Sequence, residues 1–280
     1  MKWGVNLFIV FQIGFLTVSG SFIIYNTVFP IYKRLRDEVQ KRVSTNFLMN
    51  DKKLIISTPG GLHGFYLMGI TSFIKERYDL SDCIFSGASA GAWNSLFFCF
   101  QGNNTEFIDC VLAPNIYNAT SINQLERMMS NAVYEKYKTK PELFKLNKVS
   151  IGVTLFKFPW NFQLKIYDDF ENLADVIECC VASSHIPFVT GSLIFKYRNL
   201  VSFDGGFFNY PYLNTTTPTL VITPYMWGSN FTKSSAYQNP LKFRKNNLDF
   251  RRLFEEGYKD TKNNQDKLDK LLKLRDKTKE

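Results

Sequence analysis

The sequence predicts an α/β fold, and three features of the chain support this prediction. Short apolar runs typical of buried strands occur at residues 52–58 (KKLIIST) and 82–86 (DCIFS). Residues 64–77, between these runs, carry apolar side chains at helical spacing. Glycine-rich turns follow both runs. Strands that alternate with helices along a chain indicate a sheet covered by helices.

The chain of 280 residues is 45% hydrophobic and 16% aromatic, which is enough for one sizeable domain with appendages. We divide it into four parts. A transmembrane anchor or signal peptide covers residues 1–30, and a basic juxtamembrane linker covers residues 31–51. The main domain covers residues 52–240, and a charged helical tail covers residues 241–280.

The N-terminal residues 5–29 contain no charged side chain. A helix of this length spans about 37 Å, enough to cross the core of a bilayer. A cleaved signal peptide is the alternative, with Lys2 as its basic start and the small residues 18–20 near a cleavage point. The anchor is favoured because apolar residues continue to Ile24, beyond the end of a short signal sequence.

The charges beside this segment predict its orientation. Residues 31–53 carry seven Lys or Arg against three Asp or Glu, whereas Lys2 is the only charged side chain before the segment. The positive-inside rule therefore places the C-terminal body in the cytoplasm of a single-pass membrane protein. A secreted or lumenal enzyme is the alternative, and it would present four glycosylation sequons, at Asn103, Asn118, Asn214 and Asn230.

The later elements follow from local patterns. Residues 90–100 (AGAWNSLFFCF) predict a helix with so little polar surface that we expect it at the centre of the fold. The expected elements after it are a helix from residue 171 that ends before Pro187, and strands at residues 148–156, 161–170, 200–206 and 219–225.

Composition also limits the partners. The net charge of +9 comes from the two flanks, residues 31–53 and 242–280, while the middle of the chain is near neutral. Basic flanks favour an anionic membrane surface; no helix-turn-helix, zinc-finger or RNA-binding pattern supports nucleic acid. The five cysteines include no C-x-x-C pair, so we expect buried reduced thiols. With two histidines in the chain, no local metal cluster is expected.

A G-x-S-x-G motif lies between the second predicted strand and the central helix. It consists of Gly87, Ser89 and Gly91 with alanines between them. On such a sharp turn the serine is exposed as a nucleophile, and the helix dipole favours negative charge beside it. The alternative is a tight turn that needs glycine for its backbone alone.

A serine nucleophile needs a base. The chain has only His63 and His185, and no histidine follows residue 185, so the usual order of serine, acid and histidine is poorly supported. The better candidate is Asp204, which ends an apolar strand and precedes Gly205 and Gly206. Burial in an apolar cleft raises the pKa of such a carboxylate and makes it a stronger base. An ordinary Asp-Gly turn is the alternative.

The third requirement is a set of donors for an oxyanion. Gly60, Gly61 and Gly64 lie between the first strand and its helix, where bare backbone N–H groups form an anion-binding site. A phosphate-binding loop is the alternative. The spacing is not G-x-G-x-x-G, and no P-loop Lys-Ser/Thr pair is present.

Together, "PGGLHG", "GASAG" and "DGG", in this order over roughly residues 52–225, resemble the patatin-like phospholipase family. The stretch "CCVASSHIPF" is similar to the branch that includes adipose triglyceride lipase. The sequence departs from the family at Pro59, where a glycine is frequent, and at His63, where Arg or Lys is usual.

The resemblance implies a patatin-like catalytic domain, a three-layer α/β/α sandwich with a Ser89–Asp204 dyad and no metal or organic cofactor. It implies a serine lipid acyl hydrolase of the phospholipase A or triacylglycerol lipase type, acting on lipid esters at a membrane. A catalytically silent lipid-binding protein on the same fold and a non-lipid esterase or protease are the alternatives.

Overall fold

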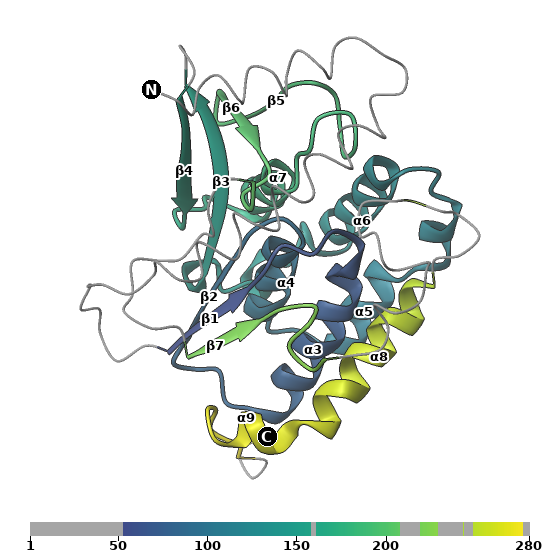
Figure 1. Cartoon of the computed structure of the whole chain (residues 1–280), viewed down its shortest axis with the longest axis vertical. Helices are drawn as coiled ribbons and strands as arrows, with labels where there is room; N and C mark the ends of the chain where they lie inside the picture. Colours follow the sequence, from purple (N-terminus) through teal and green to yellow (C-terminus); the bar gives the residue numbers. More distant parts are fainter. Residues whose placement is uncertain (1–52, 158–160, 208–218, 229–242, 244–248, 277–280) are drawn as a thin grey trace.

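A seven-stranded mixed sheet flanked by helices forms the body of the protein (Figure 1). The computed structural model describes residues 53–157, 161–207, 219–228, 243 and 249–276. The α/β class predicted from the sequence is thereby confirmed. The strands are β1 (Lys53–Ser57), β2 (Cys83–Gly87), β3 (Val149–Lys157), β4 (Asn161–Tyr167), β5 (Phe195–Tyr197), β6 (Leu200–Phe203) and β7 (Leu220–Ile222).

The predicted membrane segment (residues 5–29) and the basic linker (residues 31–51) lie outside the described residues. Within the part of the chain that is described, no helix combines the length and the apolar character needed to cross a bilayer.

Four strands form a parallel unit in the order β7-β1-β2-β3. Both faces of β1 and β2 are largely buried, as expected for parallel strands covered on two sides. Because these strands run in one direction, their carboxyl ends lie at the same edge of the sheet, which brings Ser57 beside Gly87 and Gly87 beside Ile151. In open parallel sheets this edge is where ligands bind.

Beyond this unit, β3 continues into an antiparallel part of the sheet. It pairs with β4 along one edge and with β6 over Thr154–Phe156, and β6 pairs with β5 in a hairpin. The two residues between β5 and β6, Arg198 and Asn199, have φ of 46° and 63°. Positive φ at both positions is the requirement of a type I′ hairpin turn.

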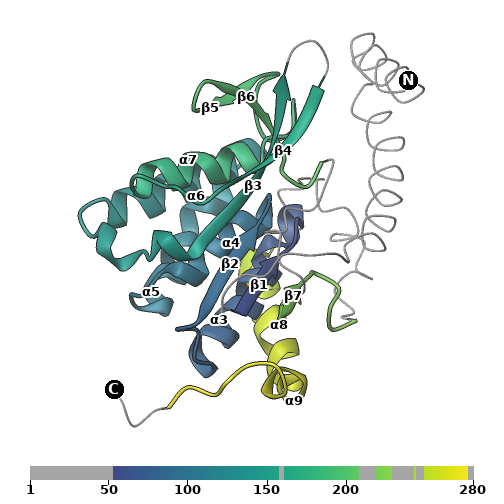
Figure 2. The same ribbon diagram turned by 90° about the vertical axis from the view of Figure 1, so that its left-hand side faces the viewer.

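The helices among the described residues are arranged around one central member, α4, which contacts β1, β2 and β3 as the sequence predicts for residues 90–100. Figure 2 shows α4, α6 and α7 on the same side of the sheet. The α-helices are α3 (Gly64–Arg77), α4 (Ala90–Cys99), α5 (Asn104–Val111), α6 (Ile122–Tyr137), α7 (Leu173–Ser183), α8 (Phe250–Asn263) and α9 (Gln265–Asp269). Four 3-10 helices join them, at Gly61–His63, Pro114–Asn118, Pro141–Leu143 and Leu146–Lys148.

The described part of the charged tail contains two helices, α8 and α9, that pack on the body. Glycines allow α3 and α8 to approach closely: a Cβ at Gly69 would lie 2.0 Å from the Phe254 carbonyl oxygen, and one at Gly257 would lie 2.1 Å from the Tyr66 carbonyl oxygen. Leu253 of α8 is completely buried. The described residues 249–276 therefore belong to the same hydrophobic core as the sheet.

A buried lysine caps the C-terminal end of the central helix, α4. The ammonium group of Lys75, on α3, donates to the carbonyl oxygens of Phe97 (2.7 Å), Phe98 (3.3 Å) and Phe100. These carbonyls have no further helical turn to bond them. Burial lowers the pKa of Lys75 to about 7. All five cysteines are free, and four of them are buried.

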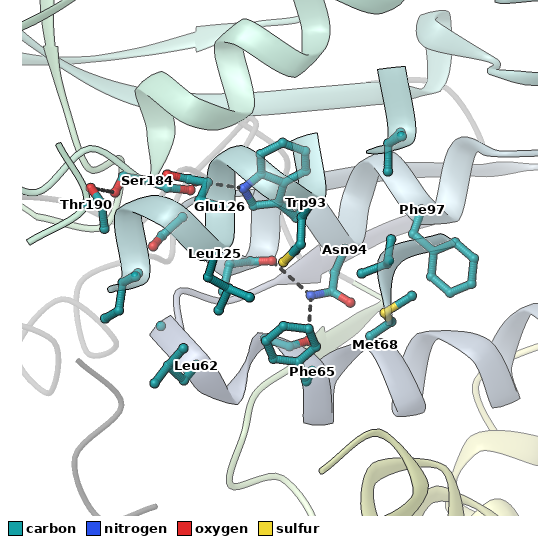
Figure 3. Close-up of a pocket in the computed structure, with 18 of the residues that line it drawn as sticks. Leu62, Phe65, Met68, Trp93, Asn94, Phe97, Leu125, Glu126, Ser184 and Thr190 are labelled. Atoms are coloured by element: carbon teal, nitrogen blue, oxygen red, sulfur yellow. Dashed lines mark hydrogen bonds between the residues drawn. The ribbon is translucent and has the colours of Figure 1, made fainter. Parts of the chain in front are cut away.

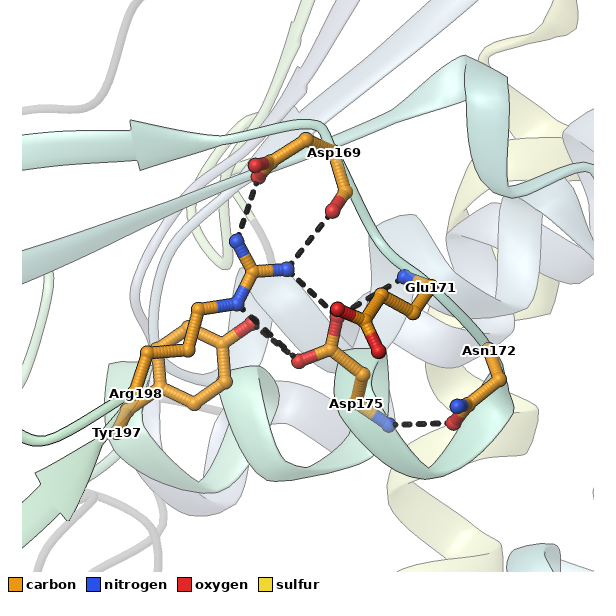
Figure 4. A network of polar contacts seen from close by, with 6 residues as sticks. All are labelled: Asp169, Glu171, Asn172, Asp175, Tyr197 and Arg198. Atoms are coloured by element: carbon orange, nitrogen blue, oxygen red, sulfur yellow. Dashed lines mark hydrogen bonds and ion pairs between the residues drawn. The ribbon is translucent and has the colours of Figure 1, made fainter.

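An ionic cluster fixes the start of α7 to the β5–β6 hairpin (Figure 4). The Arg198 guanidinium lies 2.9 Å from a carboxylate oxygen of Asp169 and 2.7 Å from one of Asp175. The Tyr197 hydroxyl donates to the other Asp175 oxygen over 2.8 Å. Asn172 caps the helix by accepting from the Asp175 amide. The cluster holds one end of α7, and the other end leads into the candidate site.

Candidate active site

Ser89 occupies the sharp turn from β2 into α4, so the strand and the helix that the sequence predicts around the G-x-S-x-G motif are confirmed. Its φ of 54° and ψ of −129° are unusual for a residue with a side chain. The glycines beside it are required sterically. A Cβ at Gly87 would lie 2.2 Å from the Gly91 carbonyl oxygen, and one at Gly91 would lie 2.0 Å from the Ser57 carbonyl oxygen.

Asp204, far away in sequence, lies directly against Ser89. It follows β6, is 4% exposed, and accepts a hydrogen bond from the Gly206 amide (2.8 Å). The Ser89 side chain interacts with the same carboxylate and lowers its pKa. Burial raises the pKa of Asp204 to about 6, and both interactions oppose that rise. At neutral pH the carboxylate is therefore ionised but more basic than an ordinary aspartate.

Ser183, the last residue of α7, holds the turn that carries Ser89. Its hydroxyl oxygen accepts from the Ser89 amide over 2.9 Å. The same hydroxyl donates to the Gly152 carbonyl oxygen on β3 over 2.6 Å. The turn is thus fixed both to α7 and to the neighbouring strand.

The backbone after α7 holds Asp204 in the same way. The Asp204 amide donates to the His185 carbonyl oxygen over 2.8 Å, and the Gly205 amide donates to the Ser183 carbonyl oxygen over 2.8 Å. The segment Ser183–His185 therefore positions both members of the Ser89–Asp204 pair. The sequence shows this segment as part of "CCVASSHIPF" but gives no indication of which atoms bind.

Gly205 leaves no room for a side chain, because a Cβ would lie 1.9 Å from the Gly152 carbonyl oxygen. We expect Gly205→Ala to push Asp204 away from Ser89 and to lower kcat/KM for ester hydrolysis by roughly a hundredfold. Hydrolysis assays combined with circular dichroism would separate this effect from unfolding. Wild-type kcat/KM in a folded Gly205→Ala variant would contradict the prediction.

His185 contacts Asp204 through its backbone. The imidazole ring is 2% exposed and packs near Phe195 and Phe203, with ring centroids 5.7 and 6.1 Å away. Burial lowers the pKa of His185. Its Nε2 has no hydrogen-bond partner among the described residues. Among the candidate bases, Asp204 is the one that interacts with the Ser89 side chain. The second histidine, His63, is buried in the Gly61–His63 turn.

The glycines of the predicted oxyanion loop have different roles in the structure. Gly61 has a φ of 52°, which favours glycine. The Gly64 amide donates to the carbonyl oxygens of Gly61 and Leu62, so it is already used inside the turn. Gly64 instead allows close packing, since a Cβ there would lie 3.0 Å from the Cβ of Ala90. The prediction of Gly64 as a donor is therefore not supported.

Two backbone amides remain available beside Ser89. Gly61 and Ala90 both line the pocket described below, and neither amide has an acceptor among the described residues. Ala90 begins α4, where the helix dipole adds partial positive charge. Gly60 does not line this pocket. Sequence reasoning missed Ala90, although its position directly after the candidate nucleophile Ser89, at a helix start, is a recognisable signal.

A pocket of about 890 Å³, part of it continuous with solvent, opens at Ser89 between α3, α4 and α6 (Figure 3). Most of its wall is apolar, including Leu62, Phe65, Met68, Phe97, Phe107, Val111, Ile122, Leu125, Met129 and Val133. The polar Asn94 is engaged within the wall, because its amide donates to the Ala90 carbonyl oxygen (2.9 Å) and the Gly64 carbonyl oxygen (3.2 Å).

Glu126 is the acidic residue of the pocket wall, and sequence reasoning did not identify it. It lies on α6, is 8% exposed and accepts from the Trp93 indole over 3.1 Å. Burial raises the pKa of Glu126 to about 8. Interactions with the Trp93 and Ser184 side chains oppose that rise, and the charge of Asp204 adds to it.

Comparison of the sequence with models of known protein families and with curated proteins gives no match. In the described ranges, no three His, Cys, Asp or Glu side chains gather closely enough to hold a metal ion.

Proposed function

We propose that this chain is a patatin-like serine lipid acyl hydrolase of the phospholipase A or triacylglycerol lipase type. The observation that carries the proposal is the buried Asp204 carboxylate, which interacts with the Ser89 side chain beside an apolar pocket. The pair has the two properties that acyl transfer requires: a nucleophile on a strained turn and a base whose pKa lies near neutrality.

In this mechanism Ser89 Oγ attacks the ester carbonyl carbon while its proton moves to Asp204. The amides of Gly61 and Ala90 donate to the oxyanion of the tetrahedral intermediate. The C–O bond to the alcohol then breaks, and the alcohol leaves with the proton from Asp204. Water, deprotonated by the same carboxylate, attacks the acyl-enzyme and releases the fatty acid and free Ser89.

The surface around the pocket supports a lipid substrate. Ile186 and Thr190 line the pocket from the loop after α7. The outer side of the same loop exposes Phe188 (69%), Leu193 (37%) and Ile194 (53%), and the loop carries no Asp, Glu, Lys or Arg. An apolar pocket that continues into an exposed apolar rim suits an acyl chain drawn from a lipid surface.

The other parts of the proposal come from the sequence. We propose that the fold is completed as a three-layer α/β/α sandwich, that residues 1–30 anchor the chain in a membrane, and that the basic flanks bind anionic lipid. The catalytic body is placed in the cytoplasm. Expression in a eukaryotic cell followed by glycosidase treatment tests this placement: unchanged gel mobility is expected, and a shift would indicate a lumenal or secreted enzyme.

A lipid panel tests the function itself. The full-length chain in mixed micelles is offered phospholipids, triacylglycerol, lysophospholipid, a short soluble ester and a peptide. Hydrolysis of long-chain lipid esters, faster than that of the short ester, is expected. Cleavage of the short ester or peptide alone would favour the non-lipid alternative. Lipid binding without any turnover would favour a catalytically silent protein.

A further inference from the structure

Glu126 is a buried carboxyl group in the wall of an apolar pocket, and the described residues give it no cationic partner. An ionised carboxylate in such a place is strongly unfavourable unless it is paired with a cation. Its neighbours Trp93 and Ser184 are polar but uncharged. The protonation state of Glu126 therefore determines whether the pocket contains a negative charge.

The polar neighbours of Glu126 do not offset the cost of ionising it. The Trp93 indole donates to one carboxyl oxygen over 3.1 Å. The Ser184 hydroxyl donates to the Cys180 carbonyl oxygen over 3.0 Å. Trp93 and Ser184 both lower the pKa of Glu126, but neither carries a positive charge, and the burial of the carboxyl group outweighs them.

The groups that face Glu126 reinforce this state. Trp93 faces it from α4, Cys180 from α7 and Ser184 from the residue directly after α7. Asp204 acts on it from the loop after β6. Burial raises the pKa of Cys180 well above its usual value, so this thiol stays neutral. The negative Asp204 raises the pKa of Glu126 further. Nucleophilic attack by Ser89 requires an ionised Asp204. The ionised Asp204 and the neutral Glu126 therefore occur together.

We propose that Glu126 is a proton-dependent gate for carboxylates in this pocket: the neutral acid admits a fatty-acid anion beside Ser89, and the ionised form expels it. The gate rests on the proposed function, because the fatty-acid anion is the product of the proposed hydrolysis. Ester substrates are uncharged at the acyl group, so the gate acts on product binding and release.

The size of the effect follows from charge repulsion. Two like charges several ångströms apart, in a site that is partly shielded from water, weaken binding on the order of tenfold or more. The transition is expected near the pKa of Glu126, about 8. A neutral alcohol with the same chain length would not experience this repulsion.

Calorimetric titration with decanoate and 1-decanol tests the gate, using the full-length chain in a non-ionic detergent. Between about pH 7 and about pH 9.5, decanoate remains an anion and decanol remains neutral. Wild-type Kd for decanoate is expected to rise roughly tenfold, while Kd for decanol stays within about twofold. A flat decanoate affinity in the wild type would overturn the proposal without any variant.

Glu126→Gln separates the gate from other titrating groups. Glutamine keeps an acceptor oxygen for the Trp93 indole but cannot ionise, so the decanoate affinity of this variant is expected to be flat over the same range. Glu178→Gln, an exposed change on α7, is the matched control and should retain the wild-type pH dependence. Lys75 also titrates near the far end of α4, and this comparison removes its contribution. A Gln variant that keeps the wild-type dependence would overturn the proposal, as would a folded one that binds neither ligand.

Thermal unfolding gives a second test that needs no ligand. The carboxyl group of Glu126 has an ordinary pKa of 4.5 in the unfolded chain and one of about 8 in the fold. Between these values the folded state holds a proton that the unfolded state has lost, so wild-type stability falls as pH rises. As the pH rises through this window, the Tm of Glu126→Gln minus the Tm of the wild type should therefore increase. A Tm difference that stays constant would count against the proposal.

These tests fail independently of the proposed function. Neither decanoate nor decanol is hydrolysed, so a pH-dependent carboxylate affinity in a chain that hydrolyses no ester would refute only the hydrolase. Hydrolysis by a chain with a flat decanoate affinity would refute only the gate.

Discussion

Ser89→Ala is expected to abolish ester hydrolysis and labelling by a fluorophosphonate probe. Loss of a serine nucleophile lowers kcat by four orders of magnitude or more in enzymes of this chemistry. The backbone of the turn is held by Ser183 and by the steric requirements of Gly87 and Gly91, none of which involves the Ser89 hydroxyl. We therefore expect a folded protein whose Tm lies within a few degrees of the wild type.

Ser81→Ala is the matched control, because Ser81 is an exposed residue before β2, at the opposite end of that strand from Ser89. It should be labelled and should hydrolyse lipid as the wild type does. If the folded Ser89→Ala variant kept wild-type turnover, the nucleophile would have to be a different residue.

Asp204→Asn is expected to lower kcat/KM by about four orders of magnitude, because an amide of the same shape cannot take the proton of Ser89. The Gly206 hydrogen bond to Asp204 can persist, so the fold should survive. His185→Gln should retain activity within about tenfold, since His185 acts on Asp204 through its backbone carbonyl. Near-complete loss in a folded His185→Gln variant, with activity kept in Asp204→Asn, would indicate a histidine base.

The pH profile gives the same assignment in the unmodified protein. In the proposed mechanism the base is the ionised form of Asp204, whose pKa is raised to about 6. Wild-type kcat/KM should therefore be constant just above that pH and fall about tenfold per pH unit below it. A profile that stays level down to the ordinary aspartate range would argue against a buried carboxylate as the base.

The sequence allowed prediction of the site wherever a backbone constraint requires a particular residue type. Two backbone segments approach at Gly87, Gly91 and Gly205 so closely that only glycine fits. Such positions are visible in a sequence as glycines between a strand and a helix. The parallel order of β1, β2 and β3 then brings their carboxyl ends together, which made the expected loops neighbours.

Other parts were not predictable because their function depends on partners far away in the chain. Ser183 binds the Ser89 amide and the Gly152 carbonyl, and its sequence neighbours show neither contact. Glu126 reads as a surface residue of an amphipathic helix until α4 and α7 are packed against α6. The sequence-based prediction also extended this helix to just before Pro187. In the structure α7 ends at Ser183, and the backbone after it turns to hold Asp204.

The amide of Gly64 shows the limit of motif reasoning. A run of glycines after a strand indicates free donors, but a 3-10 turn at Gly61–His63 uses one of them internally. A second available amide, that of Ala90, belongs to another strand-to-helix turn. The motifs therefore indicated which two side chains, Ser89 and Asp204, lie together better than they indicated which backbone amides remain available beside them.

Mass spectrometry of the wild-type chain after fluorophosphonate labelling tests the central claim most directly. The proposed dyad predicts one covalent adduct, on Ser89 within the peptide "IFSGASAGAW", formed faster above pH about 6 than below it. An adduct on a different residue, or a folded chain that hydrolyses lipid without forming any adduct, would contradict the assignment of Ser89 as nucleophile and Asp204 as its base.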